Sequence, residues 1–140
     1  AFTHNLPVTW YGLLNPVTIS VNDRVFFGVA ATVAILETAT AAQLFCTGTA
    51  AANAAFSAGA YHAIGAVFNG AASVFQVDAT IAAGDPGTNT PGGFVLGASN
   101  TGVNASNIQV KEIILYDTAH SASTMRQVIN YLAQVGNISV

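Results

Sequence analysis

The sequence predicts an all-β sandwich with one C-terminal amphipathic helix, and three observations lead to this fold class. Short runs of β-branched and aromatic residues recur along the chain, and Gly, Pro, Asn or Asp separates them every ~8–12 residues. The periodicity of a helix occurs once, close to the end. The 140 residues suit one domain that buries a core, so residues 1–140 are expected to form a single domain.

Nine segments have the composition and length of strands. Pro7 and Pro16 fall at strand starts or edges, where a missing N–H costs no ladder hydrogen bond. Asn69 and Gly70 predict a hairpin loop of about four residues. Ala50–Ala60 is low in complexity, and its pattern fits a loop or a poor helix. The expected strands are Leu6–Leu14, Val17–Val21, Val25–Ala30, Val33–Leu36, Ala42–Thr47, Tyr61–Phe68, Ser73–Val77, Gly93–Leu96 and Ile108–Tyr116.

The helix is expected at about 122–135. Ser121 is placed to cap its start, and Gly136 marks its end. Arg126 lies off the apolar face. A lone amphipathic helix after a set of strands has to lay its apolar face on a sheet, so that face is expected to be structural. It consists of Met125, Val128, Ile129, Leu132 and Val135.

Charged residues are unusually scarce. The chain has 3 Lys and Arg residues and 6 Asp and Glu residues, which is 6% of the total, and its net charge is −3; about 25% is usual in a soluble domain. Three cations cannot neutralise a phosphate backbone or an anionic bilayer, so neither nucleic acid nor a membrane surface is expected as a partner. Polar residues interrupt the charge-free segment Thr38–Val77, which argues against a membrane span there.

Several segments resemble the strands of concanavalin A-like (laminin-G-like) jelly-roll modules. His62–Gly70 matches the strand that ends in Phe-Asn-Gly, Ser73–Asp78 the strand that ends in Val-Asp, and Gly93–Gly97 the strand that ends in Leu-Gly. Ile108–Leu132 is similar to the final strand and helix of short phage and bacterial versions. The usual Gly after Val-Asp is Ala79 here, which removes an easy position for positive φ.

The resemblance implies an antiparallel jelly-roll sandwich and a structural role in a virion. Small, charge-poor modules of this kind occur in tailed-phage particles, and this chain is similar to capsid cement (decoration) proteins in size and composition. The expected location is therefore the outer capsid surface, where the chain would bridge and stabilise subunits of the major capsid protein as a homodimer or higher homo-oligomer. With only three cations to protect its edge strands, the sandwich is expected to have them covered by other subunits.

No catalytic residue is expected. Glycanases on this fold use two carboxylates on one face of a strand. Glu112 and Asp117 are five residues apart, so in an unbroken strand they point to opposite faces. The sequence therefore predicts that the chain is not an enzyme.

No cofactor and no metal ligand are expected either. Asp78 and Asp85 supply two carboxylates, fewer than the calcium sites of this superfamily require, and Asp85 is interpreted as a turn former. The histidines lie far apart and lack the spacing of a zinc motif; they are His4, His62 and His120.

Glu112 is interpreted as a structural carboxylate. Strand alternation places Glu112, Ile114 and Tyr116 on one face. If this face packs inward, the carboxylate needs a partner, which Arg126 on the helix or backbone N–H groups would provide. A Glu112 that faces a ligand is the alternative.

A carbohydrate-binding (lectin-like) module of a phage tail or adhesin protein is the alternative function. Such sites use exposed aromatic rings that stack on sugars, supported by Asn or Asp in loops. Trp10 and Tyr11 are adjacent and face opposite ways, so at least one of them is expected in the core. The loop Asn100–Asn107 is rich in Asn and Ser and suits sugar contacts or ordinary turns equally.

The chain ends are the candidate interface. If the termini act as arms, their apolar and aromatic side chains lie outside the packed core and are available to partner subunits. The residues of this hypothesis are Phe2, His4, Leu6, Ile138 and Val140.

Overall fold

The computed structural model describes residues 3–30, 33–37, 41–46 and 49–140, and the side chains of 36, 41–46 and 49–53 lie outside this description. Within these ranges the chain forms strands followed by one helix. The described part contains no helix long and apolar enough to cross a membrane. The elements are β1 (Val8–Pro16), β2 (Arg24–Gly28), β3 (Val33–Glu37), β4 (Ala41–Cys46), β5 (Thr49–Ala55), β6 (His62–Phe68), β7 (Ser73–Val77), β8 (Thr80–Gly84), β9 (Phe94–Leu96), β10 (Ile108–Tyr116) and α1 (Ala122–Gly136).

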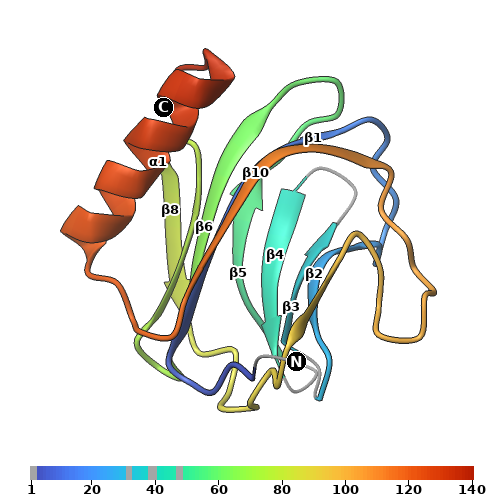
Figure 1. Ribbon diagram of the computed structural model, residues 1–140, viewed down its shortest axis with the longest axis vertical. Helices are drawn as coiled ribbons and strands as arrows, with labels where there is room; N and C mark the ends of the chain where they lie inside the picture. The colour runs from blue at the N-terminus through green and yellow to red at the C-terminus, as the bar shows by residue number, and fades with distance from the viewer. Residues whose placement is uncertain (1–2, 31–32, 38–40, 47–48) are drawn as a thin grey trace.

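Two five-stranded antiparallel sheets face each other (Figure 1). One sheet has the order β10-β1-β6-β7-β8 and the other the order β5-β4-β3-β2-β9. Helix α1 lies on the outer face of the first sheet, where it contacts β1 and β6. The prediction of an all-β sandwich with one C-terminal helix is therefore confirmed.

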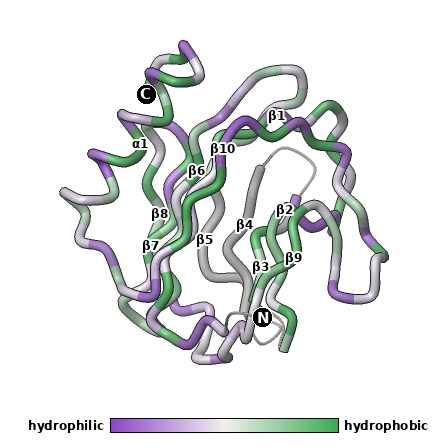
Figure 2. Tube along the Cα trace, in the orientation of Figure 1, coloured by the Kyte–Doolittle hydropathy of each residue, from purple (hydrophilic) through white to green (hydrophobic). Residues whose placement is uncertain are grey.

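The main core lies between the sheets and is built around Trp10. This side chain is fully buried, and its ring centroid lies 5.4 Å from that of Phe26 and 5.0 Å from that of Phe68. Figure 2 shows the hydrophobic stretches gathered along these strands. Aromatic pairs at such distances add about 0.5–1.5 kcal/mol to the stabilisation from burial.

A second core lies between the first sheet and α1. Met125, Ile129 and Leu132 are buried there against Tyr11 and Leu13 of β1. Gly65 of β6 leaves room for the ring of Tyr11, since a Cβ at this position would lie 2.9 Å from Tyr11 Cε1. Val128 packs against the same cluster, which confirms the predicted apolar face.

The helix begins and ends close to where the sequence predicts. The Ser121 side chain accepts a hydrogen bond from the Thr124 N–H at 3.2 Å, which is an N-cap. Asn137 follows the last turn with φ 54°, and its N–H satisfies carbonyl groups of that turn. Val135 differs from the prediction because it lies on the outer side of the helix, 43% exposed.

The predicted strands differ from the structure in three places. Val17–Val21 is not a strand, because the chain turns there and Asn22 has φ 72°. β5 forms where the alanine-rich sequence carries no clear period, and it pairs with β4. β8 follows a two-residue turn in which Asp78, and not Ala79, takes a positive φ of 51°.

Glu112 has a different partner from the predicted Arg126. Its two carboxylate oxygens accept hydrogen bonds from the Tyr131 hydroxyl at 2.9 and 3.0 Å, and Arg126 is exposed. Glu112 shares a strand face with Ile114, which packs against the helix cluster, so this face points outward to α1 and not into the sandwich. A phenol on the facing helix therefore takes the place expected for a guanidinium.

The second core predicts a large cost for truncating Ile129. Ile129→Ala is expected to lower the free energy of unfolding by about 2–5 kcal/mol, because the side chain is fully buried beneath α1. Gln127→Ala, an exposed change on the same helix, is the control and is expected to stay within about 0.5 kcal/mol of the parent. Urea unfolding followed by tryptophan fluorescence measures both, and an equal, small effect would contradict this packing.

Candidate functional site

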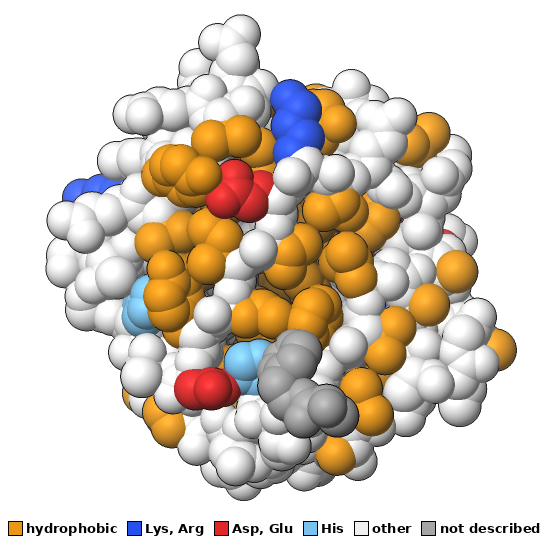
Figure 3. Space-filling model, viewed as in Figure 1, with side chains coloured by type: hydrophobic (Ala, Val, Ile, Leu, Met, Phe, Trp, Pro, Cys, Tyr) orange, Lys and Arg blue, Asp and Glu red, His pale blue; other side chains and the backbone are white. Residues whose placement is uncertain are grey.

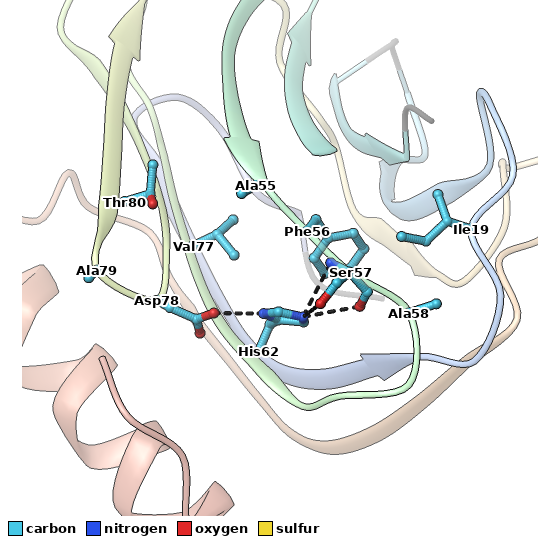
Figure 4. Close-up of a pocket in the computed structure, with 10 residues that line it drawn as sticks. All are labelled: Ile19, Ala55, Phe56, Ser57, Ala58, His62, Val77, Asp78, Ala79 and Thr80. Atoms are coloured by element: carbon cyan, nitrogen blue, oxygen red, sulfur yellow. Dashed lines mark hydrogen bonds and ion pairs between the residues drawn. The ribbon is translucent and has the colours of Figure 1, made fainter. Parts of the chain in front are cut away.

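A cavity of about 630 Å³ opens where the loop after β5 meets the turn between β7 and β8. It is larger than the hollows of about 400 and 210 Å³ beside the C-terminal part of α1. Ile19, Phe56 and Val77 give it apolar walls, and the polar side chains on it include Ser57 and Thr80 (Figure 4). The cavity combines an apolar wall with hydroxyl groups, which is typical of a small-molecule site.

His62, the first residue of β6, connects two parts of this cavity. Its Nδ1 lies 2.6 Å from Oδ2 of Asp78, and its Nε2 lies 3.1 Å from Oγ of Ser57 (Figure 4). Nε2 is also 3.3 Å from the backbone N and 3.1 Å from the backbone O of Ser57. The imidazole is packed on the ring of Phe56, with centroids 5.2 Å apart. His62 therefore joins the β5–β6 loop to the β7–β8 turn.

The carboxylate of Asp78 is held from several sides. The Ala63 N–H donates to its Oδ1 at 2.9 Å, while its own backbone N–H donates to the Ala63 carbonyl at 2.8 Å. The Gln76 side-chain amide donates to the Asp78 carbonyl at 2.6 Å. These bonds fix the carboxylate so that Nδ1 of His62 carries the proton and Nε2 faces Ser57.

The electrostatics of the pair make the His62 imidazole more basic than an ordinary histidine. The hydrogen bond to Asp78 raises the pKa of His62 above its ordinary value, desolvation by burial opposes this, and the negative charge of the carboxylate adds to the increase. Ser57 is exposed, so the end of this array is open to solvent. The His62 imidazole is thus buried, with the Asp78 carboxylate bonded to Nδ1 and the Ser57 hydroxyl close to Nε2.

A second cluster of polar groups ties the segment that follows β10 to β1 of the first sheet. The Tyr11 hydroxyl lies 2.9 Å from Nδ1 of His120, whose ring lies 4.2 Å from that of Tyr116. Burial lowers the pKa of His120. Thr9 accepts the His120 N–H and donates to the Thr118 carbonyl at 2.6 Å. These contacts hold the segment between β10 and α1 and have no cavity beside them among those described.

The predicted terminal arms are placed differently by the structure. His4 is 4% exposed, exchanges backbone hydrogen bonds with Gly92 and bonds to Asp117, while Leu6 packs against the main core, so their expected place outside the core is wrong. Ile138 packs against the helix cluster, so the expectation that it lies outside the packed core is also wrong. Val140 is 40% exposed. Phe2 lies outside the described residues.

Trp10 and Tyr11 are both buried, so the prediction that at least one of them lies in the core is confirmed. Trp10 and Tyr11 are 0% exposed, because one faces the sandwich core and the other faces α1. Neither ring can stack on a sugar. The loop Asn100–Asn107 is largely exposed and keeps its polar side chains at the surface.

The exposed surface carries few charges and several large apolar side chains. Figure 3 shows one face where hydrophobic side chains are spread among uncharged polar ones and charged groups are isolated. Four of these apolar side chains precede or follow β2, end β9 or lie in the loop after β9, and we call this set the β9 rim. It consists of Val21, Val29, Leu96 and Val103, with exposed fractions of 61, 49, 37 and 57%.

The other predicted groups do not assemble into a site. Within the described residues, no three His, Cys, Asp or Glu side chains gather closely enough to hold a metal ion. Asp85 accepts the Gly87 N–H at 2.9 Å, which confirms it as a turn former. The array of Ser57, His62 and Asp78 was not predicted: His62 and Asp78 stand in recognisable strand motifs, but Ser57 falls in the alanine-rich segment and carries no signal of its own.

Comparison with known proteins identifies the fold and no family. No protein-family model matches the chain, and no curated protein matches it. Among solved structures, Trypanosoma rangeli sialidase in complex with sialic acid is similar over 96% of this chain, with a TM-score of 0.66 and 11% identity. The same sialidase in complex with the inhibitor DANA is similar over 95% of this chain, with a TM-score of 0.69 and 13% identity. This chain spans 24% of either sialidase chain.

The expectation that the chain is not an enzyme is contradicted by these structures. It was based on the lack of a carboxylate pair, whereas the neighbours that share the fold are sialidases, one of them solved as a covalent intermediate with 2,3-difluorosialic acid. At 11–13% identity, the similarity concerns the fold. The fold therefore gives no ground for excluding catalysis.

The pair of His62 and Asp78 predicts a pH-dependent stability. Because the folded pKa of His62 is raised above 6.5, its stabilising effect is fully present below pH 6.5 and is lost as pH rises through the raised value. Asp78→Asn removes the charge and keeps a residue that tolerates positive φ. The stability advantage of the parent over this variant should therefore shrink between about pH 6 and pH 9, as urea unfolding at several pH values will show.

The control for this prediction is His120→Gln. The pKa of His120 is lowered, so its contribution has the opposite sign and is lost as pH falls. Its removal should leave the dependence on Asp78 in place. Parallel pH profiles for the parent and Asp78→Asn would show that the pair is not coupled to folding.

Proposed function

We propose that this chain is a decoration protein, bound to the outer capsid surface of a tailed phage, where it bridges and stabilises subunits of the major capsid protein. The observation that carries the proposal is the surface, which has very few charges and several exposed large apolar side chains, four of them on the β9 rim. The resemblance of the strand and helix motifs to short phage jelly-roll modules supports it. So does the size of the chain, which suits a unit repeated by symmetry.

Hydrogen bonds hold the β9 rim in shape. The Arg24 N–H donates to the Asn104 carbonyl at 2.9 Å, and the Asn100 side-chain amide donates to the Val29 carbonyl at 3.1 Å. The loop after β9 therefore runs beside β2 and carries Val103 along with it. A pre-organised rim loses little conformational entropy when it binds, which supports its use as a contact surface.

Several of the few charges do not face solvent as free groups. Glu37 is 0% exposed and accepts the Ser20 N–H at 3.0 Å, and burial raises its pKa. Asp78 is bonded to His62, and Asp117 is bonded to His4. Burial of Glu37 therefore removes one charge from the surface, and interface cores are similarly depleted of charged residues.

Cosedimentation with phage heads tests the proposal. Purified chain is mixed with undecorated heads of the tailed phage that carries its coding sequence, and bound protein is quantified after centrifugation. Stoichiometric binding that raises the heat resistance of the heads is expected. Binding should persist when NaCl is raised from about 0.05 to 0.5 M, because few charges are present to be screened.

A matched pair of variants locates the contact. Val103→Asp on the β9 rim is expected to weaken binding at least about tenfold, because it places a charge in an apolar contact. Val135→Asp is the control: this valine is 43% exposed but lies on α1, on the other sheet. Heads that bind no protein would refute the proposed function, and equal binding by both variants would refute the rim as its contact.

A carbohydrate-binding module is the second candidate, and the shared fold with sialidases is the observation that favours it. The polar loop Asn100–Asn107 is the surface that remains for it, since Trp10 and Tyr11 are buried. A glycan array with sialylated and neutral glycans tests it. Selective binding that Asn107→Ala abolishes and Ser123→Ala leaves intact would support this candidate, and an array without binding would exclude it.

A further inference from the structure

The contacts around Ser57 have the geometry of an activated nucleophile. A serine hydroxyl is weakly reactive by itself and gains reactivity when a base within hydrogen-bond reach removes its proton. Here Nε2 of His62 lies 3.1 Å from Ser57 Oγ, and Oδ2 of Asp78 lies 2.6 Å from Nδ1 on the other side of the ring. Nucleophile, base and orienting carboxylate thus stand in one line (Figure 4).

We propose that Ser57 is a nucleophile that accepts the acyl group of small carboxylic esters, with His62 as its base and Asp78 as the positioning residue. The nucleophile, the histidine and the carboxylate come from the β5–β6 loop, the start of β6 and the β7–β8 turn. This activity is independent of binding to a capsid. Its residues lie outside the β9 rim, so the two proposals succeed or fail separately.

The reaction is balanced with water as the co-substrate. Ser57 Oγ forms a bond to the ester carbonyl carbon while its proton passes to Nε2 of His62. The bond between that carbon and the alcohol oxygen breaks, and the alcohol leaves with the proton from Nε2. A water molecule, deprotonated by His62, then attacks the acyl-serine, releasing the carboxylic acid and restoring the hydroxyl.

The surroundings fit a small, apolar acyl group. Ser57 is exposed, so an ester can reach it from solvent. The cavity of about 630 Å³ has walls formed by Ile19, Phe56 and Val77, and these side chains would contact an acetyl or butyryl chain. We therefore take a short-chain ester as the substrate class, since its apolar acyl group suits these walls.

Thr80 provides an internal comparison. It lines the same cavity and carries a hydroxyl, but the side-chain hydrogen bonds of His62 go to Asp78 and Ser57. A reagent that modifies hydroxyl groups only because they lie in the cavity would treat both residues alike. A reagent that requires the neighbouring base would modify Ser57.

Acylation by p-nitrophenyl acetate tests the proposal. The full chain is incubated with this ester at pH 8, release of p-nitrophenol is recorded, and acetylated residues are mapped by mass spectrometry. Acetyl-Ser57 is expected, with no acetyl-Thr80. Ser57→Ala should lower the rate of ester hydrolysis to that of free histidine in the same buffer. Thr80→Val should keep the parent rate. Ser57→Cys should again be acetylated at position 57, because it supplies a thiol as nucleophile.

The role of Asp78 has a separate measurement. Asp78→Asn is expected to slow acylation of Ser57 about tenfold or more and to move the pH midpoint of the rate downward, because the carboxylate no longer holds a proton on the ring. Asp78 is the charged group bonded to the imidazole, whose other contacts are Ser57 and the ring of Phe56. A loss of structure alone would lower the rate without moving this midpoint.

Circular dichroism and urea unfolding confirm that each variant is folded before its rate is compared. The proposal is overturned if acetyl groups appear elsewhere and not on Ser57, or if Ser57→Ala hydrolyses the ester as fast as the parent. In either case the array would serve to hold the β5–β6 loop in place.

Discussion

The burial of β1 on both faces is the constraint on which the rest of the structure depends. Alternate residues of this strand enter different cores: Trp10 and Leu14 face the second sheet, and Tyr11 and Leu13 face α1. The strand also pairs with β6 on one edge and β10 on the other. A shift of one residue would exchange the two sets of side chains, so both cores fix the same register.

This register also positions the candidate site. Leu14 of β1 is paired with His62, which places the imidazole at the start of β6, where the chain enters the sheet. From there the ring reaches the loop after β5 and the turn after β7, two segments from different sheets. The array of Ser57, His62 and Asp78 is thus a consequence of how the two sheets meet at this edge.

The sequence predicts what periodicity and caps control. The helix, its Ser121 cap and its buried face follow from spacing alone. β5 was not predicted because its many alanines give no alternation of polar and apolar residues. Ser57 was missed because it lies in the same alanine-rich segment. The terminal hypothesis fails for His4 because its backbone pairs with Gly92 and its side chain bonds to Asp117, 113 residues away in sequence. Long-range pairs of this kind leave no local pattern.

The proposed role as a decoration protein rests on sparse charge and on a sandwich with two apolar cores. Cryo-electron microscopy of phage heads saturated with the chain tests this account most directly. The account predicts a small β-sandwich repeated at symmetry-equivalent positions outside the shell, with the β9 rim turned toward the capsid. Heads whose outer surface shows no added density would contradict it.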